Sequence, residues 1–175
     1  GAYKHVRPND HVNMAQSTND TFPTAIRLAA LMALPRLSEA LRLLESTLRQ
    51  KARQFANIVK PGRTHLQDAV PVRLGREFGA YAWILRRCGH QLRATIPLLC
   101  ETGLGGSAAG TGLNTVPGYA VHIAGELARL TGEPVRAADN LAAQMQSMHD
   151  LQQLSGAIRA LALEEVRLRD WARVL

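Results

Sequence analysis

Residues 74–99 read LGREFGAYAWILRRCGHQLRATIPLL, and this stretch decides the fold. Its apolar side chains recur at intervals of three or four residues: Leu74, Phe78, Tyr81, Leu85, Cys88, Leu92, Ile96 and Leu99. An α-helix has 3.6 residues per turn, so these side chains share one face over about seven turns. Gly89 and Pro97 weaken the pattern locally without ending it. The spacing predicts a long helix that packs lengthwise on other helices.

A second helical pattern precedes this one and begins near Pro23. Its apolar positions are Ile26, Leu28, Leu31, Leu34, Leu37, Leu41, Leu44, Leu48 and Phe55. Pro35 lies inside the pattern, so we expect either a kink or two helices that meet there. The sequence Lys60-Pro61-Gly62 is expected to end it, because neither proline nor glycine suits a helix interior.

The remaining segments complete an all-α prediction. Residues 1–20 and 60–70 are expected to be loops, and the glycine-rich residues 103–118 a loop with tight turns or close backbone approach. Further helices are predicted from about Tyr119 to Leu130 and in the last segment, where a helix that carries Leu151 and has Trp171 near its end is expected to reach the last residue. The sequence shows no strand-like alternation and no internal repeat. We therefore predict one domain over residues 1–175, an all-α bundle of long helices.

Composition limits the possible functions. The 175 residues are 46% apolar and 20% charged, as in globular proteins, and their net charge is +7. The arginines are scattered along helical stretches, so a solvated helix face or a small anionic substrate is favoured over nucleic acid as a partner. Cys88 and Cys100 would lie about 18 Å apart on one helix, too far for a disulfide. Reduced thiols fit a cytoplasmic protein, and no membrane partner is expected.

Short polar side chains are concentrated in residues 8–24, ahead of the first helical pattern. Ser17, Thr18 and Asn19 offer two hydroxyls and an amide, which can donate to carboxylate oxygens or accept from an ammonium group. Helix capping explains two or three such residues but not the whole set. A helix N-terminus also favours anions. Both interpretations, capping and ligand binding, stay open from this stretch alone.

A second polar constellation is Thr64-His65, with Arg63 and Asp68 beside it. An ordinary surface histidine is the alternative interpretation. The other histidines show no metal-ligand spacing, so no metal site is predicted. Two polar loops at the ends of long helices can meet if the helices are antiparallel or come from neighbouring subunits. Together they would suit a small dicarboxylate and the enediolate formed from it.

Three segments resemble the fumarase/aspartase superfamily: QSTND at 16–20 with FPTA after it, GRTHLQDA at 62–69, and GGSAAGTGLNT at 105–115. The resemblance is colinear and extends over nearly the whole chain. It implies the central helical domain of a homotetramer, in which three subunits contribute to each active site. The implied activity is that of a lyase acting across the fumarate double bond without an organic cofactor.

Within that superfamily, the STN form at residues 17–19 resembles aspartate ammonia-lyases, whereas class II fumarases typically carry two serines there. Arg7 also stands where fumarases usually have histidine before PND. By resemblance, Ser17 and Thr18 would bind the substrate carboxylates. Asn19 and His65 would contact the amino group, with Thr64 supporting the site. A class II fumarase is the near alternative, and a non-catalytic helical oligomerisation module is an alternative of another class.

The superfamily's catalytic serine lies in a mobile loop of the GSSxMPxKxNP kind, and residues 1–175 contain no such stretch. The chain therefore resembles the central part of such an enzyme, without its N-terminal domain and its base-bearing loop.

We predict that the purified 175-residue chain alone has little or no lyase activity, because the proton-abstracting base is missing from it. The measurement is the absorbance of fumarate with aspartate as the substrate. Robust turnover by the chain alone would contradict this prediction.

Overall fold

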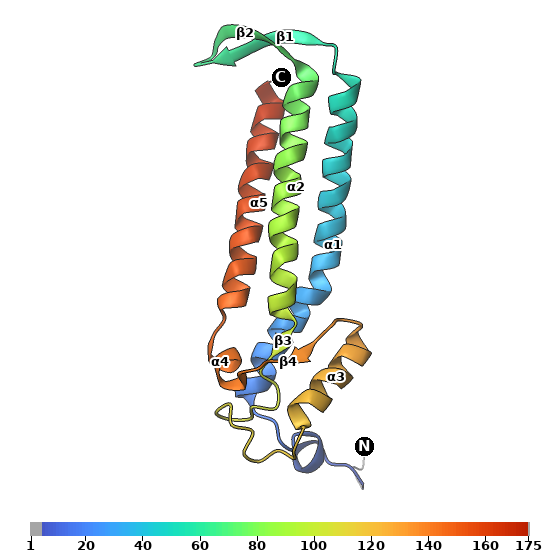
Figure 1. The fold of residues 1–175 in the computed structure, drawn as a ribbon, viewed down its shortest axis with the longest axis vertical. Helices are drawn as coiled ribbons and strands as arrows, with labels where there is room; N and C mark the ends of the chain where they lie inside the picture. Colours follow the sequence, from blue (N-terminus) through green and yellow to red (C-terminus); the bar gives the residue numbers. More distant parts are fainter. Residues whose placement is uncertain (1–4, 175) are drawn as a thin grey trace. The chain divides into compact units, whose positions relative to one another are not determined.

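The computed structural model describes residues 5–174, and its elements are mostly helices (Figure 1). In chain order they are η1 (Pro8–Val12), α1 (Thr18–Gln54), β1 (Val59–Thr64), β2 (Gln67–Arg73), α2 (Leu74–Leu99), β3 (Glu101–Thr102), α3 (Tyr119–Thr131), β4 (Arg136–Ala137), α4 (Leu141–Gln146) and α5 (His149–Val174). The predicted all-α class is confirmed. No helix in the described part is long and apolar enough to cross a membrane.

Contacts between residues divide the chain into two compact units. The first unit comprises residues 1–34 and 95–153, and the second comprises 35–94 and 154–175. The boundary in α1 falls between Leu34 and Pro35. Helix α1 nevertheless continues through Pro35 as one helix, so the chain does not form two helices that meet at this proline. The prediction of a single domain over 1–175 stays a prediction, and each unit is described separately below.

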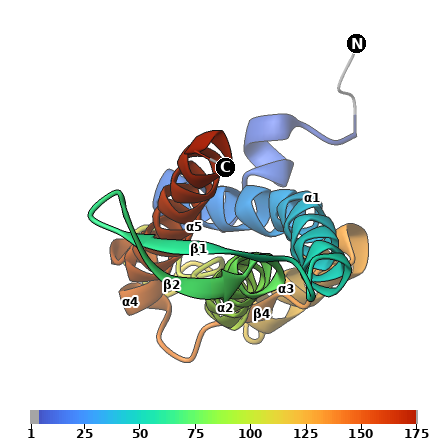
Figure 2. The same ribbon diagram turned by 90° about the horizontal axis from the view of Figure 1, so that it is seen from above.

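The second unit is built from parts of α1, α2 and α5, which lie side by side (Figure 2). Its buried residues come from all three helices: Leu41, Leu48, Ala82, Leu85, Cys88, Leu92, Leu154 and Leu161. The three-and-four spacing that predicted α2 places its members on this buried face. Near the N-terminal end of α2, the Trp171 ring of α5 packs on Phe78 and Tyr81, with ring centroids 5.1 and 4.7 Å apart.

Residues 60–70 were predicted to be a loop, and this prediction is wrong. They belong to an antiparallel hairpin, β1–β2, in which Val59 pairs with Arg73 and Thr64 with Gln67. The two turn residues, His65 and Leu66, both have positive φ angles, 50° and 60°. Such turns normally contain Asn-Gly or Asp-Gly, so the usual sequence signal was absent.

The first unit contains the start of α1, the glycine-rich loop and the segments α3, β4 and α4. Its buried apolar residues are Leu31, Leu34, Leu99, Cys100, Leu104, Ala124 and Val135. Strands β3 and β4 form a short parallel pair, and the Arg136 amide donates to the Cys100 carbonyl at 2.8 Å. Sequence periodicity missed α4, a six-residue helix that is too short to show a repeat. The two cysteines are buried and free, as expected, and burial raises the pKa of each thiol.

Close packing of α1 on α2 predicts an asymmetry between two glycines of the second unit. A Cβ at Gly75 would lie 2.3 Å from the Ala52 carbonyl oxygen, so Gly75→Ala should lower the free energy of unfolding by about 1–3 kcal/mol. Gly156 in α5 has nothing within 4 Å of such a Cβ. Gly156→Ala should therefore stabilise by up to about 1 kcal/mol. Urea unfolding of both variants tests this, and equal effects would contradict it.

Candidate active site

The side chains of Ser17 and Asp20 each accept a backbone amide in the first turn of α1. The Ser17 hydroxyl oxygen accepts from the Asn19 amide at 3.2 Å, while Asp20 Oδ1 accepts from the Ser17 amide at 2.9 Å. The Asp20 contact is that of a capping box, whereas the Ser17 hydroxyl accepts from the second helical residue instead of the third; two otherwise unpaired amide groups are satisfied. Helix α1 thus begins at Thr18, five residues before the predicted start at Pro23.

The Asp20 side chain is fully buried and joins the helix start to the glycine-rich loop. Its Oδ2 accepts from the amides of Gly105 and Ser107 at 3.1 and 2.9 Å, in addition to the Ser17 contact of Oδ1. Ser107 has a φ of 58°, a conformation that needs support from its surroundings. Burial and, secondarily, the charge of Asp20 raise the pKa of the Tyr119 hydroxyl. A single carboxylate therefore determines how this loop meets α1.

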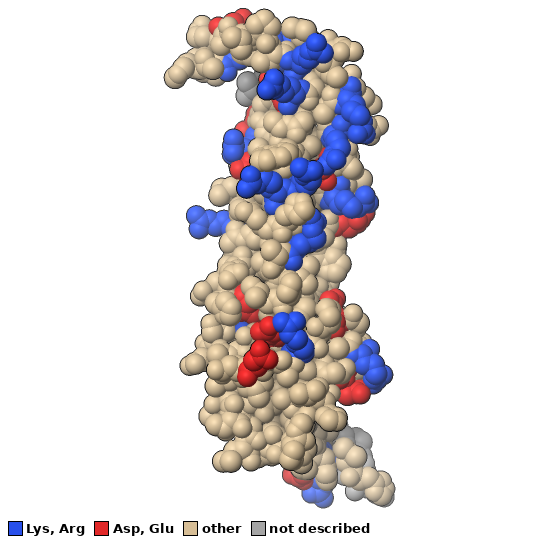
Figure 3. Space-filling view, viewed as in Figure 1, with Lys and Arg blue, Asp and Glu red and all other residues tan. Residues whose placement is uncertain are grey.

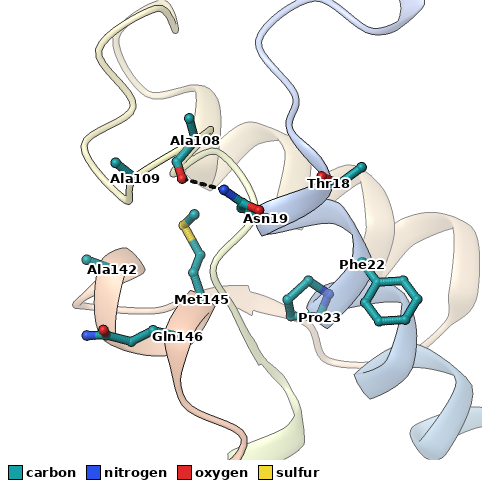
Figure 4. Close-up of a pocket in the computed structure, with 9 residues that line it drawn as sticks. All are labelled: Thr18, Asn19, Phe22, Pro23, Ala108, Ala109, Ala142, Met145 and Gln146. Atoms are coloured by element: carbon teal, nitrogen blue, oxygen red, sulfur yellow. Dashed lines mark hydrogen bonds between the residues drawn. The ribbon is translucent and has the colours of Figure 1, made fainter.

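Asn19 is oriented by a second contact with the same loop. Its Nδ2 donates to the Ala108 carbonyl oxygen at 2.8 Å (Figure 4). Because a carbonyl oxygen can only accept a hydrogen bond, the atom of the Asn19 side chain that faces Ala108 must be the donor Nδ2 and not Oδ1. The Asn19 Oδ1 acceptor is left for other partners. A substrate ammonium or hydroxyl group could donate to it.

An open cleft of about 630 Å³ lies beside these groups. It is lined by Thr18, Asn19, Phe22, Pro23, Ala108, Ala109, Ala142, Met145 and Gln146, from α1, the glycine-rich loop and α4 (Figure 4). None of these nine described residues is charged. The polar groups of the cleft are one hydroxyl and two amides, so it can orient a small polar ligand but supplies no cation to a dicarboxylate.

The α4 wall of the cleft is attached to α1 by a buried ion pair. Arg27 and Asp150 have fully buried side chains and make two contacts, Nε to Oδ2 at 2.6 Å and Nη2 to Oδ1 at 3.1 Å. Arg27 also donates to the Ser147 carbonyl at 2.9 Å, directly after α4. Gln144 of α4 donates to Asp150 at 3.3 Å and to the Glu101 carbonyl at 2.9 Å. Every charge in this network has a partner, as burial requires.

The loop also approaches α4 so closely that side chains are excluded. A Cβ at Gly106 would lie 2.3 Å from the Met145 sulfur, and one at Gly110 would lie 2.4 Å from the Ala142 Cα. Gly110 has in addition a φ of 84°, which disfavours other residues. The expectation of close backbone approach in residues 103–118 is confirmed.

The second predicted constellation lies on the hairpin. Thr64 ends β1, His65 is the first turn residue, and both are exposed. Arg63 donates to Asp68 at 3.0 Å, one of the two roles considered for this arginine, and both side chains are more than half exposed. These residues belong to the second unit, whereas Ser17, Thr18 and Asn19 belong to the first. Neither unit by itself brings the two sets together.

Sequence reasoning missed the residues that build the first unit's site. Asp20 was assigned to loop structure, although an acid three residues after a serine at a helix start signals a capping box. Arg27 and Asp150 were not among the predicted site residues. A charged residue within an apolar helical pattern, such as Arg27, was the available signal, because charged side chains are rarely buried unless they are paired. Among the described residues, no group of three or more His, Cys, Asp or Glu side chains could hold a metal ion.

The Asp20 contacts predict that Asp20→Asn loosens the glycine-rich loop. The asparagine side chain has one oxygen acceptor where aspartate has two. Its NH2 group would therefore face either the Ser17 amide or the amides of Gly105 and Ser107, which are themselves donors. The lost hydrogen bonds should lower the free energy of unfolding by about 1–3 kcal/mol. Urea unfolding should show this loss, and hydrogen exchange at Gly105 and Ser107 should accelerate. The matched control is Asp10→Asn, because Asp10 is exposed and pairs with Arg7. Its effect should stay below about 0.5 kcal/mol; comparable losses in both variants would contradict the assignment.

Comparisons with known proteins identify a family for this chain. A family model described as Lyase matches residues 1–173. The chain is 47% identical to fumarate hydratase class II of Ralstonia nicotianae and 39% identical to aspartate ammonia-lyase of Bacillus subtilis, covering all of this chain but 38% and 37% of those proteins.

Solved structures give the same result. A fumarate lyase:delta crystallin from Brucella melitensis bound to cobalt matches 99% of this chain with a TM-score of 0.93 and 39% identity. A class II fumarase from Schistosoma mansoni matches 95% with a TM-score of 0.90 and 35% identity. The chain spans 38% of each of those two structures. From the family match, the identities and the shared fold, we conclude that the chain belongs to the lyase family of the fumarase/aspartase superfamily.

Proposed function

We propose that this chain supplies the start of α1 and its cleft to a lyase that converts L-aspartate to fumarate and ammonia. The observation that carries the proposal is the orientation of Asn19. Its Nδ2 is engaged by the Ala108 carbonyl, so Oδ1 is available beside the Thr18 hydroxyl in the cleft. An amide acceptor next to a hydroxyl suits a ligand that carries both an ammonium and a carboxylate group.

The residues of the first unit have separate roles in this proposal. Thr18 donates its hydroxyl proton to a substrate carboxylate oxygen within the cleft, and Ser17 donates from the residue before it, which is not among those lining the cleft; both lie at a helix start whose dipole favours negative charge. When the proton next to the β-carboxylate is removed, negative charge accumulates on that carboxylate as an enediolate. Hydroxyl donors that are already in place stabilise this charge without reorganising. The C–N bond then breaks and ammonia leaves, having been oriented by Asn19 Oδ1.

The cleft lacks a cation, so a dicarboxylate would need further groups from elsewhere. The proposal therefore includes His65 and Thr64 of the hairpin, contributed by a neighbouring copy of the chain in a homotetramer. It also requires a base and cationic groups from segments other than residues 1–175. This assignment of the hairpin residues rests on the resemblance of GRTHLQDA at residues 62–69 to the superfamily motif.

Class II fumarase is the second candidate, and the sequence comparisons favour it. Identity to the Ralstonia nicotianae fumarate hydratase is 47%, against 39% for the Bacillus subtilis aspartate ammonia-lyase. The same enediolate would form from malate, and water would leave in place of ammonia. Asn19 Oδ1 would then accept from the substrate hydroxyl. The difference between the two reactions lies in the leaving group rather than in the carboxylate contacts.

The test is fumarate formation by a full-length enzyme that contains this chain, with L-aspartate and L-malate offered separately. The proposal expects turnover of aspartate and little turnover of malate. Asn19→Ala should lower kcat/KM for aspartate by about a hundredfold or more, because a contact to the leaving group is lost. If the enzyme converts malate but not aspartate, the proposed aspartate ammonia-lyase is wrong and class II fumarase takes its place.

Gln50→Ala is the matched control for Asn19→Ala. Gln50 is an exposed amide on the same helix, outside the cleft, and its removal should leave kcat/KM unchanged within about twofold. Circular dichroism of both variants shows whether each has folded. Equal activity of the Asn19→Ala and Gln50→Ala enzymes would contradict the role of Asn19.

A further inference from the structure

The ion pair of Arg27 and Asp150 differs from every other ion pair among the described residues, because both of its side chains are fully buried. Apart from Asp20, the other charged residues of the described chain reach the surface, as Figure 3 shows for one face of the molecule. Apolar side chains of similar size often hold helices together equally well, because removing two charges from water offsets their attraction. The pair is therefore better explained by what it positions than by the stability it adds.

The Arg27 guanidinium group contacts the backbone at both walls of the cleft. Its Nη1 donates to the carbonyl oxygen of Pro23, a cleft residue of α1, at 3.3 Å. Its Nη2 donates to the carbonyl oxygen of Ser147, directly after α4, at 2.9 Å. The guanidinium group also donates to both carboxylate oxygens of Asp150. Because this group is planar and its donors have fixed directions, these contacts set the position of the end of α4 relative to α1.

Helix α4 depends on such contacts, because six residues are too few for a helix that is stable by itself. Asn140 caps its start, where the Asn140 side chain accepts from an amide of the first turn at 3.0 Å. The buried Gln144 side chain donates to Asp150 and to the Glu101 carbonyl oxygen. The helix is therefore fixed by a cap at its start, by Gln144 in its middle and by Arg27 after its end.

Met145 links the position of α4 to that of the glycine-rich loop. Figure 4 shows its side chain reaching from α4 toward this loop. A Cβ at Gly103 would lie 2.6 Å from the Met145 Cγ, and one at Gly106 would overlap the Met145 sulfur. The Met145 side chain thus occupies the space that these two glycines leave. The amides of the two residues that flank Gly106 donate to Asp20. The loop is therefore held both by Met145 of α4 and by Asp20 of α1.

We propose that Arg27 and Asp150 are positioning residues of the lyase reaction, which affect it through Asn19. Their contacts place α4, Met145 of α4 places the loop, and the loop presents the Ala108 carbonyl oxygen that accepts from Asn19 Nδ2. Without this acceptor the Asn19 amide group can rotate, and its donor can take the place of its acceptor. The inference rests on the proposed role of Asn19, and it applies equally to ammonia and to water as the leaving group.

The experiment replaces the ion pair by apolar side chains, Arg27→Met with Asp150→Leu, in a full-length enzyme that contains this chain. The double variant should remain folded by circular dichroism, because it leaves no buried charge unpaired. Its kcat/KM should fall at least about tenfold, since small displacements of a substrate-contacting group are costly. The substrate is whichever of L-aspartate and L-malate the unaltered enzyme converts. Hydrogen exchange at the amides of Gly105 and Ser107 should accelerate.

A double-mutant cycle with Asn19→Ala separates positioning from a general structural effect. If the ion pair acts through Asn19, adding Arg27→Met and Asp150→Leu to the Asn19→Ala enzyme should change kcat/KM less than about twofold. A general structural effect would multiply with that of Asn19→Ala. The matched control is Arg129→Met with Glu126→Leu, which removes an exposed ion pair of α3 in the same unit. It should leave kcat/KM unchanged within about twofold.

Met145→Ala tests the same route without altering the ion pair, and it decides the question if the double variant does not fold. This change empties the space beside Gly103 and Gly106 and should also lower kcat/KM. Its effect should likewise disappear in the Asn19→Ala enzyme.

Two outcomes would overturn the inference alone. One is full activity of the folded double variant, and the other is losses that multiply in the cycle with Asn19→Ala. Full activity of the Asn19→Ala enzyme would overturn both this inference and the proposed role of Asn19. Conversion of malate but not aspartate would overturn the proposed ammonia-lyase and support this inference if the cycle shows the expected coupling, because Asn19 Oδ1 faces the leaving group in both reactions.

Discussion

The first unit depends on the buried carboxylate of Asp20. Three backbone amides, from Ser17, Gly105 and Ser107, donate to its two oxygens. One of them closes the first turn of α1, and the other two belong to a loop more than 80 residues further along the chain. Because an unpaired buried carboxylate would be costly, helix start and loop are stable only together. Asn19 and Ala108 then meet as a consequence of this contact.

The ion pair of Arg27 and Asp150 does for α4 what Asp20 does for the glycine-rich loop. It joins α1 to the start of α5, and Gln144 extends it to α4 and β3. Buried pairs of this kind add little net stability compared with apolar packing, but breaking one partner is expensive. Such a pair therefore acts mainly by favouring the one packing of the helices in which both of its charges are partnered. Here that arrangement places Ala142, Met145 and Gln146 opposite Thr18 and Asn19 across the cleft.

Charge and chemistry are separated between the units. The cleft is lined by uncharged residues, in a unit of slightly negative net charge, whereas the arginines concentrate along α1 and α2 of the second unit. A dicarboxylate in the cleft must then obtain its cationic contacts from residues other than the nine that line it. The second unit, for its part, carries 16 Lys and Arg against 7 Asp and Glu.

The sequence by itself determined the helices whose apolar spacing is long enough to be unambiguous. Residues 74–99 were predicted with the bounds that α2 has, because a face repeated over seven turns has few alternative explanations. The motif at residues 16–20 likewise identified the start of α1 as a candidate site. The hairpin could not be predicted, since its turn uses His65 and Leu66 at positive φ, which local preferences disfavour. Only the tertiary structure decided the roles of Asp20, Arg27 and Asp150, because their partners lie 85 to 123 residues away.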